Sequence, residues 1–274
     1  MGLKEGISSR IAALSLGYEM VGDERKFYGF APITEATEED IVWAKNDEII
    51  KETKAQIIVC RKPIDENKTF ILTENPRLAY IRMLKLYTEP IGITGNYIVG
   101  SNCNIAPGVI IYDNVRIGNN CIIHPGCVIG SEGFGFEWDG QIFHKFPHIG
   151  GVKIGNDVEI QAMTNIDRGA LGDTIIGDGT KIDTHVHVGH NTKIGNNCQL
   201  CAKVQTGGSN IIGDRVFLGP NTVIRTIGFS WTGGYNRKFG CITIGDDAFT
   251  GVGSLIVKKV KSGERVMGHP AKPF

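Results

Sequence analysis

Residues 175–224 read IIGDGTKIDTHVHVGHNTKIGNNCQLCAKVQTGGSNIIGDRVFLGPNTVI, and this stretch decides the fold. From Ile176 to Ile224, an aliphatic residue or a threonine returns at every sixth position. The position four residues after these anchors is almost always small or β-branched, as at Thr180 and Cys198. Helices need apolar spacings of three and four, and alternating strands need two, so neither explains a spacing of six. Three short strands per eighteen residues make one triangular coil, and stacked coils bury a continuous aliphatic column, which predicts a parallel β-helix.

The same repeat extends outward in both directions from this stretch. Further anchors are Val99, Ile105, Ile111, Ile117, Ile123, Ile129, Ile154, Ile160, Ile166, Ile244, Thr250 and Ile256. Together the twenty-one anchors predict about seven coils, with a slip of four residues after Ile166. Two segments rich in glycine and aromatic residues, 131–148 and 226–240, interrupt the count. Insertions leave a solenoid as loops, so these are predicted to be loops on a binding face, or else to cover a neighbouring surface.

Residues 1–90 have no six-residue period and are predicted to form a small α/β domain ahead of a β-helix domain over 91–274. Residues 9–14 indicate a short helix, and residues 56–60 and 69–72 indicate buried strands. Asn75 and Pro76 are typical of an N-cap and first helical residue, so a second helix should begin there.

The overall composition excludes several classes of function. The 29 basic and 29 acidic side chains cancel, so no basic excess indicates a nucleic-acid partner. The first twenty residues carry charges throughout, unlike a signal peptide, and no run of 18 apolar residues predicts a membrane span. The expected location is the cytoplasm.

A cluster of histidines is the main chemical feature: His185, His187 and His190. Val186 and Val188 occupy inward positions of the repeat, so the three imidazoles are predicted to point outward. A histidine is the usual general base near neutral pH, and Asp183 could orient one of them. Three histidines are also compatible with zinc, although trimeric zinc β-helices draw their ligands from successive coils, and this cluster does not. The remaining interpretation is that these three histidines are solvated surface residues with no chemical role.

The seven cysteines do not predict a metal or disulfide site, even though Cys198 and Cys201 have CxxC spacing. Four of them fall at the small inward position: Cys103, Cys121, Cys127 and Cys198. Core packing of reduced thiols is therefore the interpretation of these residues.

Several short motifs resemble one known family. They are GSEGFGF (130–136), KFPHIG (145–150), IDRGAL (166–171), GHN (189–191) and NPRLAY (75–80). Together they resemble UDP-3-O-(3-hydroxyacyl)glucosamine N-acyltransferases of lipid A biosynthesis, across nearly the whole chain. The resemblance implies a left-handed β-helix and a homotrimer with active sites in the grooves between β-helices.

The resemblance also implies roles for individual residues. His190 matches the catalytic base, Asp183 the carboxylate that supports it, and Gly208 the oxyanion-binding backbone N–H. Gly208 lies eighteen residues after His190, so the two should be neighbours on successive coils, about 5 Å apart. Trp43 and Asn46 match the residues that grip uracil. The other matches to substrate-binding positions are Phe134, Phe136, His144, Lys145, His187 and Asn191.

The chain departs from the family pattern in several places. Ile49 replaces a second uracil-stacking aromatic residue, and no histidine falls near Thr226 or Ile227, where the family has its second active-site histidine. The repeat predicts fewer coils in the N-terminal half than the family has, and the family's C-terminal helical extension is not expected. Residues 266–272 (VMGHPAK) instead resemble the end of CoA-dependent sugar acetyltransferases.

The expected activity is transfer of an acyl group from acyl-CoA or an acyl carrier protein to the amino group of a nucleotide-linked amino sugar. No bound cofactor or metal is expected. The departures favour a surface glycan and an acyl-CoA donor over lipid A itself, which stays open. Two further alternatives are a trimer resembling zinc carbonic anhydrase and a non-catalytic trimeric paralogue that binds nucleotide sugars.

Overall fold

The computed structural model describes residues 2–44, 46–225, 241–269 and 271–273. The chain divides into two compact units, and each is continuous in space but not in sequence. Unit 1 comprises Met1–Pro90 and Phe134–Ile149, and unit 2 comprises Ile91–Gly133 and Gly150–Phe274. The segment 226–240, predicted to be a loop, lies outside the described residues.

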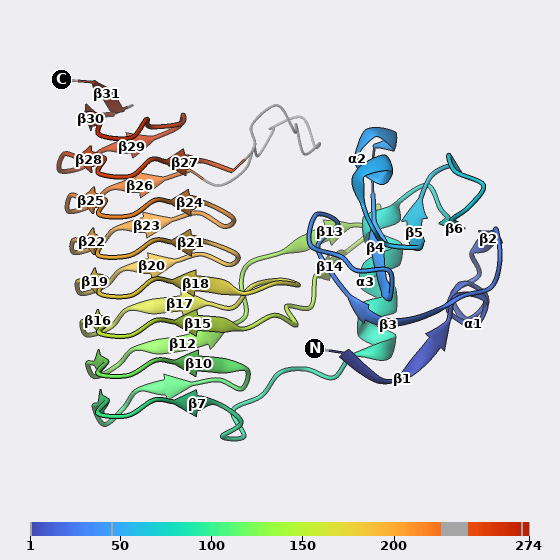
Figure 1. Cartoon of the computed structure of the whole chain (residues 1–274), viewed down its shortest axis with the longest axis horizontal. Coiled ribbons are helices and arrows are strands. Elements are labelled where there is room, and N and C mark those ends of the chain that lie inside the picture. Colours follow the sequence, from blue (N-terminus) through green and yellow to red (C-terminus); the bar gives the residue numbers. More distant parts are fainter. Residues whose placement is uncertain (1, 45, 226–240, 270, 274) are drawn as a thin grey trace. The chain divides into compact units, whose positions relative to one another are not determined.

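Unit 2 is a left-handed parallel β-helix made of three sheets, which confirms the predicted fold class (Figure 1). The first sheet contains β7 (Ile98–Val99), β10 (Val115–Ile117), β15 (Val152–Ile154), β18 (Thr174–Ile176), β21 (Lys193–Ile194), β24 (Ile211–Ile212) and β27 (Thr243–Ile244). The second contains β8 (Asn104–Ile105), β11 (Ile122–Ile123), β16 (Glu159–Ile160), β19 (Lys181–Ile182), β22 (Gln199–Leu200), β25 (Phe217–Leu218), β28 (Phe249–Thr250), β30 (Arg265–Gly268) and β31 (Ala271–Pro273). The third contains β9 (Ile110–Ile111), β12 (Val128–Ser131), β17 (Asn165–Asp167), β20 (His187–Val188), β23 (Gln205–Thr206), β26 (Val223–Ile224) and β29 (Leu255–Ile256).

The parallel register preserves the stack across the irregularities of the repeat. Ile176 pairs with Ile194, eighteen residues later, as the repeat predicts. Ile166 pairs with Val188, twenty-two residues later, so the four-residue slip leaves the coil between two strands without shifting the column of anchors. The aliphatic anchors are therefore buried together along the axis of unit 2.

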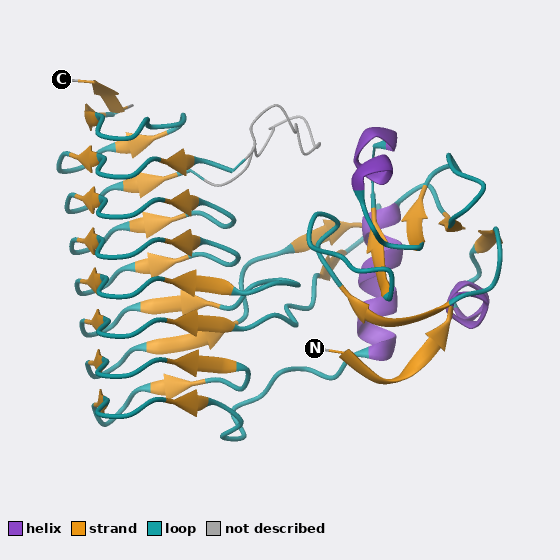
Figure 2. Ribbon diagram, in the orientation of Figure 1, coloured by secondary structure: helices purple, strands orange, loops and turns teal. Residues whose placement is uncertain are grey.

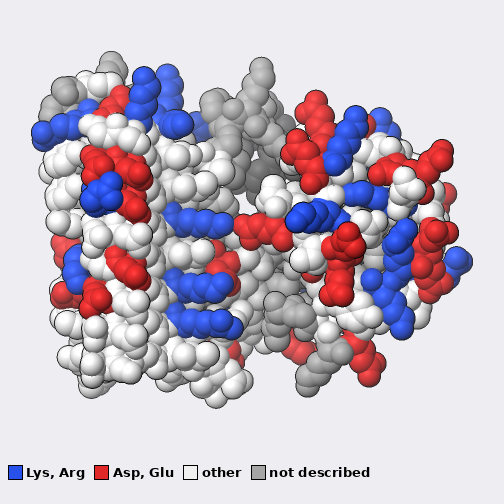
Figure 3. Space-filling view, in the orientation of Figure 1, with Lys and Arg blue, Asp and Glu red and all other residues white. Residues whose placement is uncertain are grey.

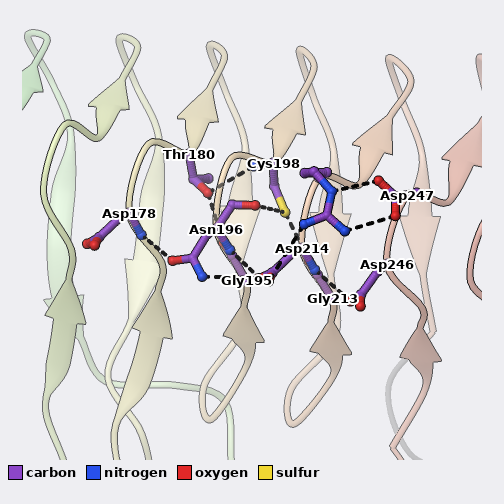
Figure 4. Close-up of polar contacts among 10 residues, drawn as sticks. Asp178, Thr180, Gly195, Asn196, Cys198, Gly213, Asp214, Asp246 and Asp247 are labelled. Atoms are coloured by element: carbon purple, nitrogen blue, oxygen red, sulfur yellow. Dashed lines mark hydrogen bonds and ion pairs between the residues drawn. The ribbon is translucent and has the colours of Figure 1, made fainter.

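The small inward positions carry hydrogen bonds as well as packing. The Cys198 thiol donates to the Gly213 carbonyl at 3.0 Å, and the Thr180 hydroxyl donates to the Gly195 carbonyl at 2.9 Å (Figure 4). Each bond joins one coil to the next. The cysteines are free, as predicted for core thiols; Cys121, Cys127 and Cys198 are buried, and Cys103 is partly buried.

A ladder of Asn and Asp side chains ties the coils together where the first sheet turns into the second. Asn196 Oδ1 accepts the Asp178 N–H at 2.9 Å, and the Asn196 N–H donates to Asp214 Oδ1 at 2.7 Å (Figure 4). The next residue, Asn197, has φ 54°, a left-handed conformation that asparagine tolerates better than most residues. Figure 3 shows acidic side chains gathered along this edge, where Arg215 also binds Asp247 at 2.7 Å.

Unit 1 is a six-stranded mixed sheet with helices (Figure 2). In sheet order, its strands are β1 (Gly2–Ser8), β3 (Lys26–Phe30), β4 (Asp40–Trp43), β5 (Ile57–Cys60), β6 (Thr69–Leu72) and β2 (Glu19–Val21). Its helices are α1 (Ser9–Ser15), α2 (Asp47–Glu52) and α3 (Pro76–Tyr87). The two predicted helices and two predicted strands are confirmed, and Asn75 Oδ1 caps α3 by accepting the Leu78 N–H at 3.1 Å. No helix in the described residues is long and apolar enough to span a membrane.

The segment predicted as a loop over 131–148 instead contains a hairpin that packs on α3 within unit 1. The hairpin pairs β13 (Phe136–Trp138) with β14 (Phe143–Lys145). Arg77 of α3 forms an ion pair with Glu137 and donates to the Phe136 carbonyl at 2.8 Å. Residues 134–149 therefore complete the packing of unit 1.

Candidate active site

His190 lies two residues after β20, and its imidazole rests against Gly208 of the next coil. A Cβ built on Gly208 would be 2.6 Å from His190 Nε2, so only glycine leaves room for the ring. The eighteen-residue register that pairs Val188 with Thr206 produces this contact. The predicted adjacency of His190 and Gly208 is thus present in the structure.

Gly208 also offers a backbone donor beside the imidazole. The N–H groups on either side are used, because Gly207 donates to the Ile224 carbonyl at 2.8 Å and Ser209 to the His190 carbonyl at 2.7 Å. The Gly208 N–H itself makes no hydrogen bond within the described part of the chain. A titratable ring and a backbone N–H in one place can move a proton and stabilise a developing oxyanion.

The neighbour of His190 Nδ1 is Asn191, whose Oδ1 lies 3.0 Å away. Asp183, which the sequence suggests as the orienting carboxylate, follows β19 of the second sheet, whereas His190 follows β20 of the third. The Asp183 carboxylate accepts the N–H of Thr184 at 2.7 Å. The two side chains therefore leave the β-helix from different sheets of one chain.

A second polar network surrounds His187, on the outward face of the third sheet. Asn165 Nδ2 donates to Asp167 Oδ1 at 2.8 Å and lies 3.2 Å from His187 Nδ1. The Ser131 hydroxyl also contacts Asp167 at 2.9 Å, and Asp167 Oδ2 is 3.7 Å from His187 Nε2. Asp167 is only 7% exposed, and no spacing in the sequence singles it out, although the twenty-two-residue register around the slip places it beside the histidine coil.

The three histidines point outward as predicted, since Val186 and Val188 are buried between them. His185 is exposed, and its Nδ1 lies 2.8 Å from the Thr184 hydroxyl. Within the described residues, no group of three His, Cys, Asp or Glu side chains is placed to hold a metal ion.

A shallow hollow of about 260 Å³ lies beside Asp183 on the second sheet, with Glu159, Gln161 and Cys201 among its lining residues. Burial, and secondarily the Asp183 carboxylate, raise the pKa of the Cys201 thiol. The thiol of Cys201 is therefore held protonated, unlike a reactive thiolate.

In unit 1, Trp43 ends β4 and is half-buried, while Asn46 is exposed and makes no side-chain cap to α2. A pocket of about 350 Å³ lies in this part of unit 1 and is lined by Ala44, Asp47, Ile50, Cys60, Arg61 and Lys62. Lys62 Nζ binds the Asp47 carboxylate at 2.8 Å, and this carboxylate raises the pKa of Lys62. Burial raises the pKa of the Cys60 thiol to about 11.

The hairpin of unit 1 carries the remaining predicted substrate-binding residues. Phe134 is 85% exposed and makes an edge contact with Phe136, with ring centroids 4.9 Å apart. His144 Nε2 lies 2.6 Å from Asp139 Oδ2, whereas Lys145 is exposed. The backbone N–H of Ile142, together with His144, holds the pKa of Asp139 well below its usual range.

Comparison with known proteins agrees with this geometry at the level of the repeat. Residues 96–131 and 173–208 match the family described as bacterial transferase hexapeptide (six repeats), so unit 2 carries hexapeptide repeats.

Among curated proteins, the chain is similar to UDP-3-O-acylglucosamine N-acyltransferases. It is 61% identical over 84 residues to that of Dechloromonas aromatica, a match that covers 31% of this chain and 24% of the relative. It is 38% identical over 170 residues to that of a Janthinobacterium species, covering 62% of this chain and 45% of the relative. The matches therefore span less than half of the length of these relatives.

Solved structures show the same fold. The UDP-N-acetylglucosamine acyltransferase of Campylobacter jejuni superposes with a TM-score of 0.55 at 16% identity, covering 87% of this chain and 68% of that one. The Francisella novicida UDP-N-acetylglucosamine acyltransferase has a TM-score of 0.54 at 24% identity, covering 65% of this chain and 59% of that one. At these identities the likeness is one of fold alone.

Proposed function

We propose that this protein is an N-acyltransferase that moves an acyl group from an acyl thioester to the amino group of a nucleotide-linked amino sugar. The thioester is acyl-CoA or an acyl carrier protein, and the product serves lipopolysaccharide or another surface glycan. The observation that carries the proposal is the contact between His190 Nε2 and Gly208, which puts a base next to an unused backbone donor.

The chemistry follows from these two groups. The sugar amine attacks the thioester carbonyl carbon while His190 Nε2 takes a proton from the nitrogen. The carbonyl oxygen gains negative charge, and the Gly208 N–H donates a hydrogen bond to it. When the tetrahedral intermediate collapses, the C–S bond breaks and the imidazolium returns the proton to the leaving thiolate. Atoms and charge balance with no metal or redox partner.

Other features support the nucleotide-sugar acceptor. The relatives in the comparison are named as N-acyltransferases of UDP-3-O-acylglucosamine. In unit 1, we assign nucleobase binding to Trp43 and Asn46, a half-buried indole and an exposed amide at one end of β4. We assign substrate contacts to Phe134, Phe136, His144, Lys145 and His187 as well.

The proposed assembly is a cytoplasmic homotrimer in which each site lies in a groove between β-helices. The carboxylate of Asp183 then supports a histidine from a neighbouring copy, because the same carboxylate and His190 leave one chain from different sheets. Sedimentation of the purified protein tests the trimer, and a monomer would contradict it.

Mass spectrometry of reaction mixtures tests the activity. UDP- and dTDP-linked amino sugars are each paired with acetyl-CoA and with a 3-hydroxyacyl carrier protein, and products are identified by mass. We expect the native protein to acylate the sugar in one of these pairings. His185→Ala, a matched control at an exposed histidine, should acylate the same sugar. His190→Ala is expected to lose about 100-fold or more of this activity.

The pairing that reacts decides between lipid A and another glycan. A product from UDP-3-O-acylglucosamine and a hydroxyacyl carrier protein assigns the lipid A reaction, and one from acetyl-CoA assigns an acetyltransferase. No product from any pairing, or full activity of His190→Ala, would overturn the proposal. Nucleotide-sugar binding without thioester cleavage would indicate the non-catalytic paralogue, and stoichiometric zinc would indicate the carbonic anhydrase alternative.

A further inference from the structure

The amide of Asn191 is held so that only its oxygen faces His190. The N–H of Ala170 points at Asn191 Oδ1 from 2.9 Å, and a backbone N–H can only donate. The side-chain atom that faces Ala170 is therefore the amide oxygen. The same oxygen lies 3.0 Å from His190 Nδ1.

This geometry fixes where the imidazole carries its proton. An amide oxygen only accepts hydrogen bonds, so Nδ1 of His190 must be the protonated nitrogen. In a neutral ring with Nδ1–H, the other nitrogen, Nε2, is the basic one. Nε2 is also the ring atom nearest to the place where a Cβ of Gly208 would stand.

The Ala170 N–H is available because of the four-residue slip in the repeat. Ile166 and Val188 are paired neighbours, although twenty-two residues separate them instead of eighteen. The extra residues form a tight turn in which a Cβ on Gly169 would collide with the carbonyl oxygen of Gly172. The turn begins at Arg168, a side chain only 2% exposed that donates from Nε to the Gly130 carbonyl at 2.6 Å.

The backbone of Asn191 is restrained as firmly as its side chain. Its N–H donates to the hydroxyl of Thr174 at 2.9 Å, and Thr174 is fully buried. Its φ of 60° lies in the left-handed region, where asparagine, aspartate and glycine are the residues best tolerated. Asparagine therefore tolerates the left-handed backbone of this corner and also provides the side-chain oxygen that faces His190 Nδ1.

We propose that Asn191 is a positioning residue that holds His190 in the Nδ1-protonated tautomer, and that the turn at 168–172 is the support that holds Asn191. The inference rests on the proposed function for the importance of Nε2 as a base. The two hydrogen bonds that meet at Asn191 Oδ1, one from the Ala170 N–H and one from His190 Nδ1, are present in the protein without substrate.

Nitrogen-15 NMR of the histidine rings tests the tautomer without any turnover. Long-range proton–nitrogen correlation spectra of the substrate-free protein distinguish the two neutral tautomers, and His190→Ala assigns the His190 signals. We expect Nδ1–H at His190 in the native protein and in Asn191→Asp, which keeps an oxygen acceptor. Asn191→Gly keeps the left-handed backbone, removes the acceptor, and is expected to give a mixture of tautomers.

Asn221→Gly is the matched control, because Asn221 has φ 56° at another corner and an exposed side chain. It should leave the His190 signals unchanged. An Nε2–H tautomer in the native protein, or an unchanged His190 spectrum in Asn191→Gly, would overturn the proposal whatever the protein catalyses.

Kinetics separate positioning from substrate binding. In the acyl-transfer assay, Asn191→Gly is expected to lower kcat about 10- to 100-fold with little change in KM, because a mixture of tautomers and a misplaced ring leave only part of the protein with a basic Nε2 in position. Asn191→Asp should restore most of kcat. A loss confined to KM in both variants would show that Asn191 binds substrate instead.

Discussion

The imidazole of His190 and the backbone of Gly208 occupy successive coils, so closely that a Cβ on Gly208 would be 2.6 Å from Nε2. Gly208 has no left-handed φ, so alanine is compatible with the backbone there. We therefore predict that Gly208→Ala displaces the imidazole without unfolding the coil. Since a misplacement of about 1 Å costs about 100-fold in rate, kcat should fall by that order.

Gly92→Ala is the control for this prediction, because its added methyl would meet its nearest neighbours at 3.4 and 3.7 Å, ordinary contact distances. It should leave kcat unchanged. Activity of Gly208→Ala equal to that of the native protein would contradict the geometry described for His190.

Substitutions at Cys198 test the pairing of one large and one small inward residue. Threonine occupies the same position at Thr180 and donates to the next coil as the Cys198 thiol does. We predict that Cys198→Thr changes the free energy of unfolding by less than about 1 kcal/mol, and that Cys198→Leu lowers it by about 1 to 3 kcal/mol through overpacking. Urea denaturation followed by circular dichroism measures both. Equal stability of the two variants would argue against a limit on side-chain size at this inward position.

The ladder along the turn between the first and second sheets predicts a contrast at Asn196. Asn196→Ala removes the acceptor of the Asp178 N–H and should lower the free energy of unfolding by about 1 kcal/mol. Asn196→Asp keeps this acceptor but replaces the Nδ2 donor, 3.3 Å from Asp214 Oδ1, with a second carboxylate, so it should protect the Asp178 amide while charge repulsion lowers its stability below native. Hydrogen exchange of the Asp178 amide should accelerate only in the alanine variant.

The hairpin of unit 1 is predicted to depend on pH through Asp139. Because its pKa is depressed in the folded protein, the carboxylate stabilises the hairpin above the unfolded value of about 3.9. That contribution is lost as the pH falls through the lower folded value. Amide exchange in β13 and β14 should therefore be slower in the native protein than in Asp139→Asn at pH 6. The exchange rates of the two proteins should become equal in strong acid. A difference that stays constant with pH would contradict the assignment.

The pocket of unit 1 contains a thiol that should resist alkylation. With a pKa of about 11, roughly 0.1% of Cys60 is thiolate at pH 8. Its reaction with iodoacetamide should rise about tenfold per pH unit between pH 8 and 10, as followed by peptide mass spectrometry. The exposed Cys241 provides the internal comparison in the same digest. Rapid labelling of Cys60 at pH 7 would contradict its burial.

The β-helix was predictable because its pattern of inward-facing residues repeats over a short stretch of sequence. An anchor every six residues fixes which side chains face inward, so the burial of Val186, Val188 and Cys198 followed from counting. The same count placed Gly208 next to His190. The left hand of the coil came from the family resemblance and not from the spacing, since ordinary parallel crossovers are right-handed.

The contacts that the repeat does not encode could not be predicted. Arg77 meets Glu137 sixty residues later, and nothing periodic marks either residue. The partner of His190 Nδ1 was likewise missed, because the N–H that orients Asn191 comes from Ala170, inside the slip where the count fails. Irregular segments are where this chain departs from its own pattern, and the neighbours of the candidate base are built there.

The discontinuity of unit 1 bears on how the chain matures on the ribosome. Strands β13 and β14 are translated only after the first two coils of the β-helix, β7 through β12, have been made. Until residues 137–146 have been made, α3 lacks Glu137, the ion-pair partner of Arg77, and Phe146, one of the aromatic neighbours of Tyr80. The packing around α3 is therefore completed only after the first two coils of the β-helix have been synthesised, so the order of synthesis is not the order of completion.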